Sequence, residues 1–150
     1  MIASACTRKH VRAACLSVFI VLLAPFASAT CSLSVQGVNF GGYDFMSSQN
    51  LDSVGHVVVT CDLSSSFSVS LSTGAGSYAS RVMQNGVHLL SYNLYTDPAH
   101  TMVWGDGTGG SVVVSGSGTH VDEVIYGSAP AGQNPYLGAY SDAVTVTLTF

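Results

Sequence analysis

The sequence predicts an all-β domain, a sandwich or a barrel of about seven or eight short strands. Apolar and polar residues alternate with a period of two in one segment after another, which is the pattern of strands with one buried face. Glycine, present at 16 positions, interrupts these segments every few residues. No window shows the i, i+3, i+4, i+7 spacing of apolar residues that an amphipathic helix needs, so we expect no helix in the domain.

Three strands are expected in the first half of the domain. Residues 31–40 alternate loosely and stop at Gly41-Gly42. Residues 54–61 form a stronger pattern, with Val57, Val59 and Cys61 on one face. Residues 67–72 alternate large apolar residues with serine, and a pair of glycines around Ala75 ends them.

The second half alternates strands with glycine-rich connections. We interpret residues 81–86 as a link that ends in the turn signal Asn85-Gly86. A strand follows at 88–95 and ends at Asp97-Pro98. The remaining segments are a glycine-dense loop at 104–110, short strands at 112–114 and 120–126, and a long connection at 128–138.

The most regular strand is the last one, residues 144–150. Val144, Val146, Leu148 and Phe150 fall on one face, and threonine occupies every position of the other. Chain ends fray unless a neighbour holds them. We therefore expect this strand to be paired, and its partner is the main question about function.

Residues 1–29 have the layout of a secretory signal peptide. Basic residues precede an apolar run from Ala13 to Ala24, which is too short to span a bilayer as a helix. Ala27-Ser28-Ala29 fits the small-x-small cleavage rule, so we expect a mature chain that starts at Thr30. An uncleaved anchor is the alternative. Residues 30–150 then form one domain, large enough for a single hydrophobic core.

The mature part carries almost no positive charge. Arg81 is its only arginine or lysine, and one cation against eight acids leaves a formal net charge of −7. The acids are Asp44, Asp52, Asp62, Asp97, Asp106, Asp122, Glu123 and Asp142. This balance argues against nucleic acids and anionic membranes as partners, because both attract basic patches.

Cys31 and Cys61 are the two cysteines that remain after cleavage. In an exported domain we expect them to form one disulfide, which closes a loop of about 30 residues and stabilises the fold by roughly 3–4 kcal/mol. Two free thiols are the alternative. A zinc site is disfavoured, since the chain has no CxxC or HxxxH spacing.

We find no motif for catalysis, a cofactor or a metal. The loop at 104–110 lacks the lysine of a phosphate-binding loop, and the sequence has no Gly-x-Ser-x-Gly motif. His120 and Asp122 share a strand face, but a pair without a third ligand is weak evidence for a metal site. Paired carboxylates stay open, because spatial pairing is invisible in a sequence. We therefore expect a protein that is not an enzyme and binds no cofactor.

A binding module is the second class of function. The domain has seven tyrosines, which together with the 104–110 loop could line a carbohydrate- or surface-binding face without any polymerisation. Tyrosines in a β-sandwich more often fill half-buried positions and keep the hydroxyl in water.

A series of short motifs spans nearly the whole mature chain. In order, they are Cys31, Asn39-Phe40-Gly41 with Tyr43, 57–61, 71–74, Arg81-Val82-Met83, 90–95, 104–107, 124–127, and 138–142 running into 144–150. Together, in this order and at this spacing, they resemble the spore coat protein U domain, the family of the subunits of archaic chaperone–usher pili.

The resemblance implies an immunoglobulin-like β-sandwich that is incomplete because its final strand is missing. The groove left by that strand would border the C-terminal edge at Val144, Val146, Leu148 and Phe150. In this family a periplasmic PapD-like chaperone lends a strand to the groove, an outer-membrane usher assembles the fibre, and a segment of the next pilus or coat subunit replaces the chaperone. The implied function is that of an exported structural subunit of a surface fibre or coat that supports adhesion or biofilm formation.

One departure from the family concerns the N-terminus. Polymerising subunits carry a longer alternating segment before their first cysteine, whereas cleavage after Ala29 would leave Cys31 as the second residue. Such a chain accepts a strand but has none to give, which suits a terminal or tip-type subunit or a coat protein that does not polymerise by strand exchange. The tip adhesins of the family have two domains, and we expect one here.

Overall fold

The computed structural model describes residues 29–150, which form strands and loops without a helix. The strands are β1 (Cys31–Gln36), β2 (Leu51–Leu71), β3 (Arg81–Asn85), β4 (His88–Tyr95), β5 (Val114–Ala129) and β6 (Val146–Thr149). The prediction of an all-β domain is confirmed. Within residues 29–150, no helix is long and apolar enough to cross a membrane. The predicted signal peptide lies outside the described residues, apart from Ala29.

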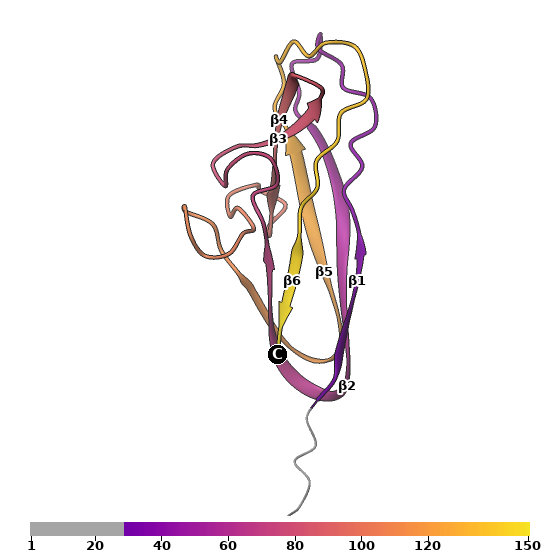
Figure 1. Ribbon diagram of the computed structural model, residues 1–150, viewed down its shortest axis with the longest axis vertical. Coiled ribbons are helices and arrows are strands. Elements are labelled where there is room, and N and C mark those ends of the chain that lie inside the picture. The colour runs from indigo at the N-terminus through magenta and orange to yellow at the C-terminus, as the bar shows by residue number, and fades with distance from the viewer. Residues whose placement is uncertain (1–28) are drawn as a thin grey trace, which may run out of the picture.

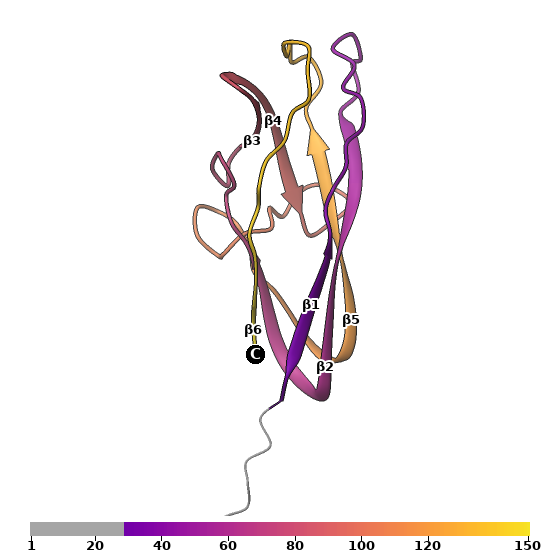
Figure 2. The same cartoon turned by 45° about the vertical axis from the view of Figure 1, so that its right-hand side comes forward.

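Every strand pair is antiparallel, and the sheet runs in the order β1-β2-β5-β4-β3, with β6 attached to β2. β5 pairs with β2 along most of its length, so β1 and β6 lie one after the other on the opposite edge of β2. β2 and β5 both bend (Figures 1 and 2). The sheet therefore curls around one core. It stays open on one side, where β1 and β6 form its edges.

β2 is one strand where the sequence predicts two. The prediction places separate strands at 54–61 and 67–72, but β2 runs through both. Residues 62–66, four of which are polar, hide this continuity, because they lie where the pairing with β5 shifts, between Thr60 and Ser65. Val59 and Phe67, on either side of the shift, are both buried. A strand needs no alternation at such an irregularity, so periodicity alone divides it.

Two further strand predictions are wrong for related reasons. Residues 81–86 contain β3, which pairs with β4 through the Asn85-Gly86 turn, so they are not merely a link. Of the short strands predicted at 112–114 and 120–126, the second lies within β5, and only Val114 of the first belongs to it. Gly116 masks the continuity of β5, because a Cβ there would lie 2.7 Å from the ring of Phe67.

The other strands agree with the pattern. The strand at 88–95 has its predicted bounds, and the one predicted at 31–40 ends earlier, at Gln36. The terminal strand is β6, and its alternation is present: Val144, Val146 and Leu148 are partly buried, while the threonines between them are exposed.

The core lies inside the curl. A disulfide joins Cys31 of β1 to Cys61 of β2, as expected from the sequence. Trp104 is fully buried, and its indole N–H donates to the Val69 carbonyl at 3.0 Å. The buried apolar residues are Val57, Val59, Cys61, Phe67, Val69, Leu71, Tyr92, Leu94, Trp104, Ile125 and Ala129.

Candidate functional site

An open groove of about 810 Å³ runs along the side of the domain between β1 and β6. One wall is the chain from Val35, near the end of β1, to Phe45. The other wall is the segment 135–146, which leads into β6. Figure 1 shows these walls as the purple chain that follows β1 and the yellow chain that precedes β6.

The groove is lined mainly by apolar side chains. Phe40 reaches from one wall to the floor, where its ring meets that of Tyr92 edge-on with 5.7 Å between centroids. Asp142 is the only charged residue of the lining. An apolar surface of this kind is costly in water unless something covers it. The floor residues are Leu51, Leu71, Met83, Leu90, Tyr92, Leu94, Ile125 and Ala129.

The wall that leads into β6 has an unpaired backbone edge. The Ser72 N–H donates to the Thr145 carbonyl at 2.9 Å, and Ser141 exchanges hydrogen bonds of 2.8 and 3.1 Å with Gln84. Backbone groups alternate sides along an extended chain, so Ser141 faces β3, and Thr145, Thr147 and Thr149 face β2. The even-numbered residues from 142 to 148 turn their N–H and C=O groups the other way, where no strand of the described chain pairs with them.

β1 has a free edge of the same kind. The Asp62 N–H donates to the Thr30 carbonyl at 3.0 Å, which places the even-numbered residues of β1 against β2. The backbone groups of Cys31, Leu33 and Val35 therefore point away from β2. Among residues 29–150, β1 has no other strand neighbour. The groove thus lies between the chain that leaves β1 and the chain that leads into β6, and both strands have one unpaired edge.

The residues predicted to form the acceptor edge divide into two groups. Val144 and Val146 line the groove. Leu148 packs against the core without lining the groove, and Phe150 is 57% exposed beside a separate shallow hollow that Phe67 borders. The geometry therefore places the groove alongside the segment before β6 and the start of β6 itself.

Asp142 is held where the wall meets the floor. Its Oδ2 accepts a hydrogen bond from the Tyr92 hydroxyl at 2.7 Å, and its Oδ1 accepts from the Ala75 and Ala143 N–H groups at 3.0 and 2.8 Å. Burial raises the pKa of Tyr92, and the hydrogen bond to Asp142 raises it further. The phenol therefore stays protonated and keeps donating to the carboxylate.

Sequence reasoning did not identify Phe40, Tyr92 or Asp142 as groove residues. They come from segments far apart in the chain, and only the folded sheet brings them together. Each lies in one of the motifs that carried the family resemblance, which is the one signal in the sequence that pointed to them.

The residues considered for metal binding do not converge. Nδ1 of His120 lies 3.3 Å from Oγ1 of Thr60, whereas Oδ1 of Asp122 lies 3.0 Å from Nδ1 of His56. Residues 29–150 contain no group of three His, Cys, Asp or Glu side chains placed to hold a metal ion.

The features considered for sugar binding are also dispersed. Trp104 of the 104–110 loop is buried, and so is Tyr78, which lies next to Gly105 and Gly109 of that loop, so their rings offer no stacking surface. Tyr92 lies in the core, and Tyr43 donates to the Pro130 carbonyl at 2.6 Å. Trp104 and these three tyrosines therefore do not contribute to a carbohydrate-binding face.

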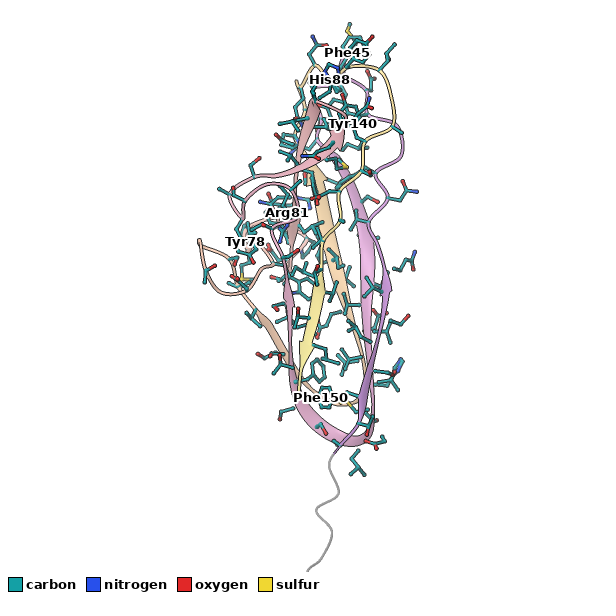
Figure 3. All side chains as sticks on the ribbon, in the orientation of Figure 1. Phe45, Tyr78, Arg81, His88, Tyr140 and Phe150 are labelled. Atoms are coloured by element: carbon teal, nitrogen blue, oxygen red, sulfur yellow. A yellow bond between two sulfur atoms is a disulfide. The ribbon has the colours of Figure 1, made fainter. Side chains whose placement is uncertain are left out.

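The end of the domain opposite the C-terminus carries exposed apolar side chains. Three loops meet there: the segment after β1, the β3–β4 turn, and the connection from β5 to β6 (Figures 1 and 2). Phe45, His88 and Tyr140 mark this end in Figure 3, and Phe150 marks the other. We call it the apolar end; its exposed large apolar residues are Phe45, Met46, Val87, Leu89, Tyr136 and Leu137.

Comparison with known proteins decides the family. A profile of the Spore Coat Protein U domain matches residues 17–147. The chain belongs to this family. Protein U of Myxococcus xanthus is 36% identical to it over 127 residues, which cover 75% of this chain and 71% of that protein.

One solved structure shows the fold of this spore coat protein U domain. The chaperone–tip adhesion subunit pre-assembly complex CsuC–CsuE, from archaic chaperone-usher Csu pili of Acinetobacter baumannii, matches with a TM-score of 0.59 and 20% identity. The match covers 82% of this chain but only 40% of the solved one, and at this identity it shows the fold alone. The minor tip subunit HdaB of the E. coli Hda pilus matches 78% of this chain at 15% identity with a TM-score of 0.42, which is too low to establish a shared fold. The immunoglobulin-like fold is confirmed, and family and fold are those of a structural protein, not an enzyme.

Proposed function

We propose that this spore coat protein U domain is a structural subunit of a surface fibre or coat whose groove accepts a β-strand from another protein. One observation carries the proposal: an apolar groove lies between the chain that leaves β1 and the chain that leads into β6, and the chain at Val144 and Val146 has an unpaired edge. A strand laid in the groove would pair with the free backbone groups of Val144 and Val146. Its alternate side chains would cover the floor around Tyr92 and Ile125.

An empty groove would be a liability for this domain. Unpaired strand edges invite aggregation, and natural proteins cover, charge or shorten them. Here the free edge borders apolar side chains, and Asp142 is the only charge nearby in the lining. An added strand would supply the main-chain hydrogen bonds and bury the apolar floor in one step.

The proposed partners follow from this mode of assembly. They are a periplasmic PapD-like chaperone that lends the first strand, an outer-membrane usher, and neighbouring pilus or coat subunits. The solved CsuC–CsuE structure is a pre-assembly complex of a chaperone with a tip adhesion subunit, and its likeness to this chain supports a chaperone as partner. The net charge of −7 over residues 30–150 supports the exclusion of nucleic acid.

The proposed route is export through the periplasm to the cell surface or an extracellular fibre or coat. It rests on the predicted signal peptide at 1–29 and on membership of the family. Cleavage after Ala29 would leave a subunit that receives a strand without passing one on. The proposal therefore places the protein at the end of a fibre or in a coat.

We also propose a role in adhesion or biofilm formation, which the apolar end supports. Val87 and Leu137 are 90% and 89% exposed at the tips of two different loops. The rings of His88 and Tyr136 stack at 4.6 Å and join these loops. Contiguous exposed apolar patches mark contact surfaces in soluble proteins.

Trypsin offers a direct test, because Arg81 is the only lysine or arginine after Arg12 and it is fully buried. We would express the full chain with its predicted signal peptide, purify the exported form, and add a synthetic peptide of about nine residues that alternates valine and threonine. We expect the empty domain to aggregate or be cut after Arg81, and the peptide to protect it. A domain that is soluble, resists trypsin without a partner and gains nothing from the peptide would contradict the proposal.

A further inference from the structure

The geometry points to Asp142 as the residue that sets the register of the strand in the groove. We infer that the incoming strand carries a hydrogen-bond donor, preferably a cationic side chain, at the inward position opposite Asp142, and apolar side chains opposite Val144 and Val146. This inference rests on the proposed function, because it assumes that a strand occupies the groove.

Asp142 lies on the same free edge as Val144 and Val146. Ser141 and Thr145 both turn their backbone groups toward β3 and β2, so Asp142, Val144 and Val146 all turn theirs toward the groove side. All three residues line the groove. An added strand would therefore place successive inward side chains, two residues apart, opposite Val146, Val144 and Asp142.

The Asp142 carboxylate has bonding capacity left for an incoming donor. A carboxylate accepts about four hydrogen bonds. Within the described chain, Oδ1 of Asp142 accepts two and Oδ2 accepts one, from Tyr92. Oδ2 therefore keeps an acceptor position, and Asp142 lines a groove that is otherwise without charge.

Neighbouring positions along the groove differ sharply in what they favour. An apolar side chain opposite Asp142 would take water from a carboxylate without replacing its hydrogen bond, which is unfavourable. A lysine opposite Val144 would bury an ammonium among apolar groups, which is also unfavourable. If the incoming strand shifts by two residues, the side chain that was opposite Asp142 lies opposite Val144 or leaves the groove, and its neighbour takes the place opposite Asp142. One charged group in an apolar groove can therefore select one register among several, as polar residues do in coiled-coil interfaces.

The test uses the exported full chain and two sets of changes. The peptides alternate valine and threonine over about nine residues. One inward valine is replaced by lysine or by methionine, either at the centre or near one end. Both ends of the peptide are tested, so that the experiment covers parallel and antiparallel pairing. The protein variants are Asp142→Asn and, as a control that removes a charge elsewhere, Asp106→Asn.

We expect one lysine position to bind wild-type protein more tightly than the matched methionine peptide, by roughly tenfold for one charge-assisted hydrogen bond. Asp142→Asn should abolish this preference, and Asp106→Asn should keep it. If lysine weakens binding equally at every position, or if its advantage survives Asp142→Asn, Asp142 does not set the register, although the groove still accepts a strand. If no peptide binds at all, the proposed function itself is contradicted, and the inference about Asp142 with it.

A second variant keeps the test informative if Asp142→Asn does not fold. Tyr92→Phe removes the one hydroxyl that donates to Oδ2 at 2.7 Å and frees another acceptor position. We expect the preference for lysine at the favoured position to be retained or to grow in this variant. A smaller preference would overturn the inference.

Discussion

Arg81 donates two hydrogen bonds to the carbonyl of Ser72, at 3.1 Å from Nε and 2.8 Å from Nη2, although its side chain is fully buried. It also donates to the Trp104 carbonyl and to Oδ1 of Asn93, both at 2.7 Å. Burial lowers the pKa of Arg81. The guanidinium thus joins the start of β3 to the end of β2, to β4 and to the loop that carries Trp104.

We predict that Arg81→Met lowers the free energy of unfolding by about 3–5 kcal/mol, because it leaves buried acceptors without a donor. Arg81→Lys should recover only part of this loss, since an ammonium cannot reproduce the planar fork. Urea unfolding of the protein with a strand peptide bound in the groove measures both changes in the free energy of unfolding. A loss below about 1 kcal/mol for Arg81→Met would show that these hydrogen bonds matter little.

Gly127 packs closely against two side chains of the groove wall, Val38 and Phe40. A Cβ at this position would lie 2.7 Å from Cγ1 of Val38 and 2.9 Å from the ring of Phe40. We predict that Gly127→Ala displaces both side chains, costs about 1–3 kcal/mol of stability and weakens binding of a strand peptide. Gly42→Ala is the matched control for stability, because a Cβ there meets open space. Equal effects of the two changes on the free energy of unfolding, or unchanged peptide binding by Gly127→Ala, would speak against this role of Gly127.

Glu123 gives the protein a defined response to pH. It shares the inner side of β5 with Val121 and Ile125, and burial, with a smaller contribution from Asp122, raises the pKa of Glu123 above its ordinary value of 4.5. The folded state thus holds the proton more strongly than the unfolded state. The contribution of Glu123 to stability is then fully present below pH 4.5 and decreases as the pH rises through its folded pKa.

We therefore predict that Glu123→Gln stabilises the protein at about pH 7 more than at about pH 4. Urea unfolding at the two pH values checks this, with Asp44→Asn as a control for the loss of one surface charge. A stabilisation that is the same at both pH values would contradict the assignment.

The Cys31–Cys61 disulfide fixes β1, which forms one border of the groove. Replacing both cysteines by serine should lower the free energy of unfolding by roughly 3–4 kcal/mol in the chain-entropy estimate. Wild-type protein treated with a reductant should match the double variant. If reduction and replacement both leave stability unchanged, the link does not hold β1 in place.

How far the sequence predicts this fold depends on where its alternation is interrupted. β4 was predictable to the residue because Asn85-Gly86 and Asp97-Pro98 bound a clean alternation. β2 and β5 were not, because the shift after Thr60 and the glycine at 116 break the pattern inside continuous strands. β3 was not predicted, because it is short and begins with an arginine, whose burial depends on partners from other segments.

The groove was less predictable than the strands. Alternation placed Val144 and Val146 on one face, which the structure confirms, but it could not show which of their edges is free. That depends on Ser141 pairing with Gln84 and Thr145 with Ser72, contacts between distant parts of the chain. Only the family resemblance pointed to a missing strand, and it did not show that Leu148 and Phe150 lie outside the groove.

Amide hydrogen exchange tests strand acceptance most directly, because neighbouring residues near the end of the chain face opposite sides. The Thr147 N–H faces β2, whereas the N–H groups of Val144, Val146 and Leu148 face the free edge. With the alternating peptide bound, we expect exchange at Val144 and Val146 to slow by at least about tenfold, while Thr147, already paired, changes little. Unchanged exchange at Val144 and Val146 under saturating peptide, or equal slowing at all three positions, would contradict the account of a strand paired to this edge.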